Sequence, residues 1–174
     1  MKIFIGICIA LVFVSATVLE ESIRWSDQNL SWEQYKKRVG SPGIYKAFTY
    51  TGVRFEMTEA NGKSVINVEA FFDPTESWVH PDHLAPTLLN HEQRHFDLTE
   101  VYARKIKLQS SPFEAIDIQE FVKNGSSEKV KRIYSELTNE LFKKQQQYDV
   151  ETRHGTLVEK QVEWDAWVEE QLNN

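Results

Sequence analysis

Hydrophobic residues recur at helical spacing through most of the second half of the chain. Between about residues 86 and 109 they fall at steps of three or four, which is the period of one face of an α-helix. That face consists of Leu88, His91, His95, Leu98 and Tyr102. The pattern therefore predicts a long helix whose buried stripe includes two histidines.

Three more helices are predicted after this one. A short helix is expected near residues 112–123, and either Ser126 or Ser127 is a suitable N-terminal cap for the next. That helix should stop near Gly155, since glycine is common just beyond a helix end. The last helix is expected over about residues 157–172.

The first half of the chain alternates in the manner of β-strands. Residues 44–58 and 64–72 are the two expected strands, and Asn61-Gly62 between them is a strong signal for a hairpin turn. A short helix capped by Ser31 should precede them. This order of elements predicts an α+β fold, in which a small antiparallel hairpin or sheet packs on a helical core.

The first sixteen residues differ in character from the rest. Lys2 is followed by an apolar run from Ile3 to Val14 and a Val-Ser-Ala exit, which is the arrangement of a secretory signal peptide. The run is short for a membrane span, and an uncleaved anchor is the alternative interpretation. We predict a signal peptide over residues 1–16 and a single domain over residues 17–174. The protein should be secreted or periplasmic, with no stable membrane span after cleavage.

Composition narrows the range of functions. The only cysteine, Cys8, lies within the predicted signal peptide, so the remaining domain has to be stabilised by core packing or a metal ion rather than by disulfides. The formal net charge of −6 argues against a nucleic-acid partner, which requires a basic surface.

The segment from His91 to His95 reads His-Glu-Gln-Arg-His and matches the pattern H-E-x-x-H. On a helix, residues four apart project from one face at about 40° to each other, so the two imidazoles can bind one zinc ion. Glu92 lies beside them, where its carboxylate can take a proton from a zinc-bound water. A pair of core histidines is the alternative, but the position of the motif on the buried stripe favours the zinc site.

Catalytic zinc usually has a third protein ligand and keeps a water in the fourth position. We expect the third ligand to be His154, in the polar stretch that joins the last two helices, and Asp149 is the alternative. Tyr148 is a candidate catalytic residue that would donate a hydrogen bond to a developing oxyanion, with a core tyrosine as the competing interpretation. His80 and His83, in an expected loop over residues 77–86 before the motif, are interpreted as exposed.

These motifs together resemble a bacterial family, domain of unknown function 922, whose members are predicted secreted zinc-dependent proteases. The resemblance extends over nearly all of the chain after the signal peptide. It depends most on the segments Asn90–Asp97 and Tyr148–Gly155, and further on Gln161 with Trp164. It implies a metallopeptidase-like, zincin-like core with zinc bound by the two histidines of the motif, and His154 as a ligand by its position in the second segment.

The sequence thus predicts an exported zinc metallohydrolase, a metalloendopeptidase acting on a peptide or protein substrate. Two other functions stay open. A zinc amidase would use the same chemistry on another substrate such as peptidoglycan, and a non-enzymatic binding domain would keep zinc only for stability. Glu92 argues against the last of these, because a structural zinc site has no use for a base.

Overall fold

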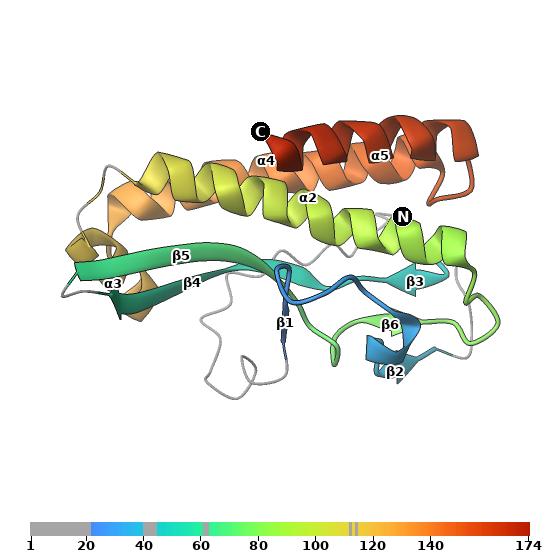
Figure 1. The fold of residues 1–174 in the computed structure, drawn as a ribbon, viewed down its shortest axis with the longest axis horizontal. Helices are drawn as coiled ribbons and strands as arrows, with labels where there is room; N and C mark the ends of the chain where they lie inside the picture. Colours follow the sequence, from blue (N-terminus) through green and yellow to red (C-terminus); the bar gives the residue numbers. More distant parts are fainter. Residues whose placement is uncertain (1–21, 40–44, 61–62, 112, 114) are drawn as a thin grey trace, which may run out of the picture.

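The computed structural model describes residues 22–39, 45–60, 63–111, 113 and 115–174. The predicted signal peptide and Cys8 lie outside these ranges. The described residues form helices and two small sheets, so the predicted α+β class is confirmed (Figure 1). No helix within these ranges combines the length and the apolar character that a bilayer span requires.

The larger sheet is a long antiparallel hairpin. β4 (Thr51–Ala60) and β5 (Lys63–Phe72) pair along their whole length, and β1 (Ile23–Arg24) pairs with the end of β5. Ala60 lies opposite Lys63, so only two residues connect the strands. The predicted Asn61-Gly62 turn itself falls outside the described residues, but the register agrees with a two-residue connection.

A second sheet is made of three very short strands, β2 (Lys37–Arg38), β3 (Ala47–Phe48) and β6 (Trp78–Val79), with β6 in the middle. The first predicted strand is therefore divided, because its beginning forms β3 and pairs with β6 instead of β5. β6 falls within the stretch expected to be a loop. Two-residue strands are too short to produce a periodic pattern in the sequence.

The short helix expected after Ser31 is a single 3-10 turn, η1 (Trp32–Gln34). The Gln34 side chain accepts a hydrogen bond from the Ser31 backbone N–H at 2.6 Å, which closes the start of the turn. The Trp32 carbonyl accepts a hydrogen bond from the Arg38 guanidinium at 2.9 Å. The Lys36 backbone N–H donates to the Pro74 carbonyl at 3.0 Å instead of continuing the helix, and the chain enters β2.

The four predicted helices are confirmed, with ends close to those expected: α2 (Pro86–Ser110), α3 (Ala115–Asn124), α4 (Glu128–Thr152) and α5 (Val158–Asn173). Proline at the first position suits the start of α2, since its missing N–H would have no partner there. In Figure 1, α2 lies along the β4–β5 hairpin, and α4 and α5 pack on the side of α2 away from the sheet. The central helix of the fold is therefore the one that carries the H-E-x-x-H motif.

Two clusters of buried side chains meet along α2. One lies among the helices and the hairpin and includes Leu98, Leu141 and Tyr148. The other joins the N-terminal segment to the second sheet and includes Phe72 and Phe96. The first turns of α2 pack on the second cluster and its later turns on the first, so the motif helix is held by both.

Replacement of Leu98 by alanine should destabilise the fold strongly. Leu98 is fully buried on α2, and a large-to-small change at such a site removes about 2–5 kcal/mol from the free energy of unfolding. Leu108, on the same helix, is 73% exposed, and Leu108→Ala should change the free energy of unfolding by no more than about 0.5 kcal/mol. Urea denaturation of both variants measures this difference, and equal effects would contradict the packing described here.

Candidate metal centre

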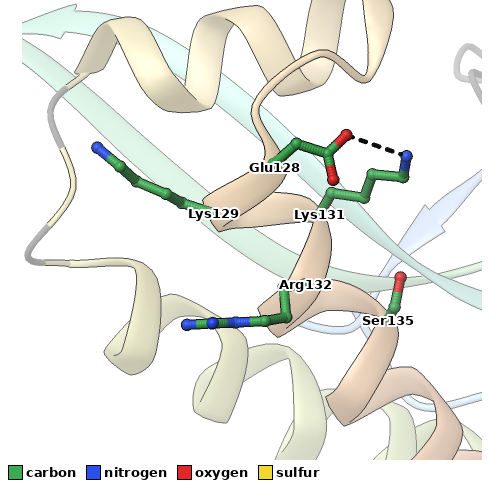
Figure 2. Close-up of a pocket in the computed structure, with 5 residues that line it drawn as sticks. All are labelled: Glu128, Lys129, Lys131, Arg132 and Ser135. Atoms are coloured by element: carbon green, nitrogen blue, oxygen red, sulfur yellow. Dashed lines mark hydrogen bonds and ion pairs between the residues drawn. The ribbon is translucent and has the colours of Figure 1, made fainter.

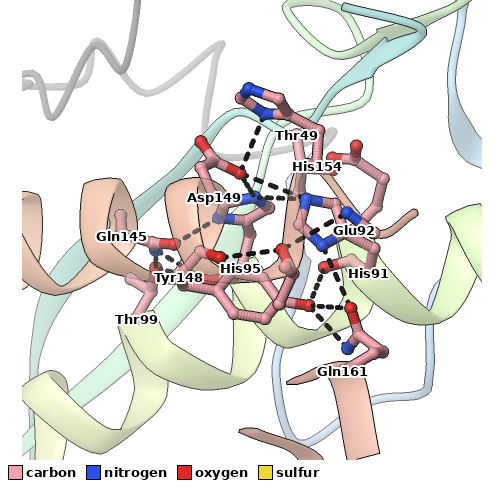
Figure 3. Close-up of polar contacts among 12 residues, drawn as sticks. Thr49, His91, Glu92, His95, Thr99, Gln145, Tyr148, Asp149, His154 and Gln161 are labelled. Atoms are coloured by element: carbon pink, nitrogen blue, oxygen red, sulfur yellow. Dashed lines mark hydrogen bonds and ion pairs between the residues drawn. The ribbon is translucent and has the colours of Figure 1, made fainter. Parts of the chain in front are cut away.

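The motif helix turns its two histidines towards α4. His91 and His95 are separated by one turn of α2, and their Nε2 atoms lie 3.2 Å apart. The His91 ring is almost completely buried, and the two rings meet edge to face at 4.8 Å. In the structure, both imidazoles therefore project from one face of α2, as predicted (Figure 3).

Asp149, in the last turn of α4, completes a cluster with these histidines. Its Oδ1 atom lies 3.1 Å from His91 Nε2 and 3.0 Å from His95 Nε2. Candidate ligand atoms of these three residues all lie within 4.8 Å of one another. Ligands about 2.0–2.1 Å from a tetrahedral zinc ion are about 3.3 Å apart, so the spacing of the three atoms is close to that of a zinc site.

His154 lies at the outer side of Asp149 and is not a member of this group. Its Nδ1 atom is 3.4 Å from Asp149 Oδ1, and its side chain is 41% exposed. The structure thus brings Asp149, the alternative third ligand, against both histidines and leaves His154 adjacent. The ligand role of His154 stays a prediction.

A left-handed turn presents His154 in this position. Arg153, His154 and Gly155 have φ angles of 50°, 55° and 75°, and the first two carry a side chain in a conformation that L-residues rarely adopt. The His154 backbone N–H donates to the Asp149 carbonyl at 2.9 Å, which caps the end of α4. A left-handed residue commonly ends a helix, and residues in sparsely populated backbone conformations also cluster at functional sites, where the surrounding structure holds them in place.

A buried glutamine faces the other ring nitrogen of each histidine. Gln161 of α5 places its Oε1 atom 3.2 Å from His91 Nδ1, and Gln145 of α4 places its Oε1 atom against His95 Nδ1. Gln145 carried no signal in the sequence, because it stands in the polar run Lys-Lys-Gln-Gln-Gln over residues 143–147, which has the composition of an exposed helix face. A count of helical turns back from Asp149 would have placed it on the same side of α4.

The electrostatics of the cluster are dominated by the Asp149 carboxylate. Burial by itself would raise the pKa of Asp149, but the neighbouring His95 charge and the hydrogen bonds from both histidines hold it well below its usual range. Burial by itself would lower the pKa of His95, but the charges of Asp149 and Glu92 outweigh it and raise this pKa to about 9. The carboxylate is therefore ionised at neutral pH and available to a cation.

Glu92 is buried beside the histidine pair. One of its carboxylate oxygens, Oε2, accepts a hydrogen bond from the Thr49 hydroxyl, and Thr49 in turn contacts the Tyr35 hydroxyl at 2.6 Å. Burial and the charge of Glu92 both raise the pKa of Tyr35 well above its usual value. Thr49, just after β3, is a further residue of the site that the sequence analysis did not identify.

Tyr148 lies behind the histidines. It is fully buried, and its ring stacks on His91 with ring centroids 4.5 Å apart. Its hydroxyl donates to the His91 carbonyl at 3.2 Å and also contacts Gln161. The catalytic role of Tyr148 stays a prediction, and these contacts favour the competing interpretation of a core tyrosine that supports His91.

The interpretation of His80 as an exposed loop histidine is wrong. His80 is only 6% exposed. Its backbone N–H donates to the Lys46 carbonyl at 2.8 Å, which ties this loop to the segment before β3. Its ring lies 5.1 Å from that of His83. Neither histidine belongs to a group of candidate metal ligands among the described residues.

An open pocket of about 500 Å³ lies at the start of α4 and is lined by Glu128, Lys129, Lys131, Arg132 and Ser135 (Figure 2). Lys131 pairs with Glu128 at 3.3 Å, and Lys129 pairs with Asp117 at 3.6 Å. Asp149 lies fourteen positions after Ser135 on α4, which is about 21 Å along the helix axis. The pocket is therefore not part of the candidate metal centre.

The fold and the site define an α+β protein with a buried His-His-Asp cluster on its central helices. Residues 23–155 match the family described as a bacterial protein of unknown function, DUF922. Because this match extends over more than half of the chain, the protein belongs to that family. No curated protein and no solved structure matches the chain.

Gly155 should be needed for the position of His91. A Cβ atom at Gly155 would lie 2.8 Å from the His91 Cβ atom, and the φ of 75° adds strain of about 1–2 kcal/mol for alanine. Gly155→Ala should therefore shift the NMR signals of the His91 ring and lower the free energy of unfolding by about 1–3 kcal/mol beyond the strain alone. Gly125→Ala, at a φ of 68° between α3 and α4, is the control for backbone strain. Equal stability losses with unchanged His91 signals would show that the close contact has no consequence.

Proposed function

We propose that this protein is a zinc metallohydrolase that cleaves peptide bonds, with His91, His95 and Asp149 as the metal ligands and Glu92 as the general base. The observation that supports the proposal most is the convergence of two imidazole nitrogens and one carboxylate oxygen within 3.0–3.2 Å of one another. Export is part of the proposal and depends on the sequence of residues 1–16.

The donor set fits a catalytic zinc ion. Two neutral histidines and one carboxylate are a common ligand set of hydrolytic zinc, and three protein ligands leave a fourth position free. A zinc ion bound there would lower the pKa of a coordinated water to about 7. The same ligand types also bind iron in oxygenases, but Glu92 beside the ligands favours hydrolysis, which needs a base.

The contacts of Glu92 suit the role of a base. The Thr49 hydroxyl holds one carboxylate oxygen, Oε2, which leaves Oε1 to accept a proton from an attacking water. No Lys or Arg of the described residues forms an ion pair with Glu92.

The zincin-like character of the core belongs to the same proposal. It depends on the combination of the H-E-x-x-H motif on α2 with a third ligand from a later helix and a β-hairpin alongside. His154, next to Asp149 and partly exposed, is the residue best placed to reach a group bound beside the metal. A peptide or protein substrate is proposed, because H-E-x-x-H helices with a general base hydrolyse amide bonds in this class.

Zinc content should depend on each of the three proposed ligands. The purified wild-type protein is expected to hold one zinc ion per chain, and His91→Ala, His95→Ala and Asp149→Ala should each lose it, because two remaining ligands bind zinc weakly. Metal analysis by mass spectrometry after dialysis measures the stoichiometry. Unchanged zinc content in either histidine variant would contradict the site.

The same measurement separates the two candidates for the third ligand. If Asp149 is the ligand, His154→Ala should keep its zinc while Asp149→Ala loses it. The opposite result would assign the third position to His154, as the sequence analysis expected. A variant of His83, which lies outside the ligand group, serves as the control for general effects of histidine removal.

Glu92→Gln should separate binding from chemistry. Glutamine keeps the size of the side chain and can still accept from Thr49, but it cannot take up a proton. The variant should fold, retain zinc and lose at least about 10²-fold in rate, which is the scale of a general base. Hydrolysis of casein and of purified peptidoglycan, measured side by side, also distinguishes a peptidase from an amidase. Full activity of the zinc-loaded variant would exclude Glu92 as the base.

A further inference from the structure

We propose that Gln145 and Gln161 are positioning residues that fix both histidines in the tautomer whose Nε2 atom is free for a metal ion. This inference rests on the proposed function, because it concerns the same metal site. It adds two residues and one helix, α5, to what the ligand set alone defines.

The orientation of the Gln145 amide is determined by its surroundings. Its Nε2 atom lies 2.8 Å from the His95 carbonyl oxygen, which can only accept a hydrogen bond. The NH₂ group must therefore point there, and the Oε1 atom must face His95 Nδ1, as Figure 3 shows. Since an amide oxygen can only accept, the hydrogen of this bond is on Nδ1.

Gln161, on α5, determines the hydrogen position on His91 in the same way. Its Nε2 atom donates to Asp165 Oδ1 at 2.8 Å, and a carboxylate can only accept. Its Oε1 atom consequently faces His91 Nδ1 at 3.2 Å, so the hydrogen of that bond is on Nδ1 as well. Asp165 is fixed in turn by the Arg94 guanidinium at 2.9 Å.

The consequence for both rings is the same. Without a metal ion the Nε2 atoms donate to Asp149 Oδ1, so a cation that binds there has to displace those hydrogens. The neutral imidazole that then remains has one N–H group, and because that group is on Nδ1 the lone pair of Nε2 is available. Both Nε2 atoms point at Asp149 Oδ1, where the metal ligands converge. The opposite tautomer of either ring would direct an N–H group at a cation, so the two glutamines select the form that can bind a metal.

The choice of amides rather than carboxylates affects the charge of the site. Both glutamines are buried, at 3% and 7% exposure, and neither carries a charge. A carboxylate in their place would make the histidine more basic and partly neutralise the metal ion. With amides, Asp149 is the one anionic ligand, which leaves a bound metal more positively charged.

The inference also gives α5 a place in the site. The family match ends at residue 155, before α5 begins at Val158. Gln161 nevertheless makes the Nδ1 contact of His91, and the Arg94–Asp165 ion pair ties α5 to the motif helix at the same level. The last helix is therefore expected to determine metal binding and not only stability.

Gln145→Leu and Gln161→Leu test the proposal in the full-length mature protein. Each removes the acceptor at Nδ1 and should weaken zinc binding about 10- to 100-fold, the effect typical of partners that orient a metal ligand. Titration with zinc chloride against a chelating indicator measures this change. Gln147→Leu is the matched control on α4, because Gln147 is exposed and bonds to Lys144 and Glu151 on the same helix, away from the histidines, and its zinc affinity should equal that of the wild type.

The tautomer of each histidine is the decisive measurement, because glutamines with a purely structural role would not change it. Long-range ¹⁵N–¹H NMR spectra of the zinc-loaded protein should show both histidines bound through Nε2 with Nδ1 protonated. Gln145→Glu and Gln161→Glu keep an acceptor at Nδ1 and should preserve this pattern and retain zinc, even though the lost NH₂ donor lowers stability. If a leucine variant does not fold, the glutamate variants still test whether an acceptor at Nδ1 is enough to hold the tautomer.

Each outcome has a defined meaning. Unchanged zinc affinity and an unchanged NMR tautomer pattern in the folded leucine variants would overturn the positioning role while leaving the metal site intact. Loss of zinc in the glutamate variants as severe as in the leucine variants would also overturn it, because the acceptor is kept. Absence of zinc binding by the wild-type protein would instead reject the proposed function.

Discussion

The contact of one buried carboxylate with two buried histidines is the interaction on which the rest of this structure depends. Burial of an ionised group is unfavourable unless opposite charge and hydrogen bonds compensate it. Asp149 receives both from His91 and His95, and its pKa is held well below the usual range although burial opposes this. In the absence of a metal ion, protonated His95 supplies the positive charge, and a bound cation would take over that function.

Several elements are arranged to keep this contact in place. α2 supplies both histidines, α4 supplies Asp149, and α5 reaches the back of His91 through Gln161. The segment after β3 reaches Glu92 through Thr49, so the second sheet also contributes to the centre. The strained turn at the end of α4 closes the arrangement, with Gly155 directly against His91. Such a network of hydrogen-bonded polar groups favours one arrangement of the helices over others.

Much of the fold and part of the site followed from the sequence. The four helices, the hairpin strands and the placement of the motif on a buried helix face were predicted from periodicity. The sequence did not decide the third member of the cluster, because Asp149 and His154 lie only five residues apart and both residue types bind zinc. Only the left-handed backbone of residues 153–155 turns His154 to the outer side, and isolated left-handed residues other than glycine have no clear sequence signal.

What the sequence determined by itself is local: the period of each element, the four-residue spacing of the histidines and the glutamate between them. These features depend on residues near one another in the chain, so the geometry of a helix is enough to derive them. The tertiary structure decided which distant groups complete the site, namely Asp149, Gln161 and Thr49, and it buried His80 against expectation. Those contacts depend on how helices and loops pack across long separations, and a pattern read along one chain contains no measure of that packing.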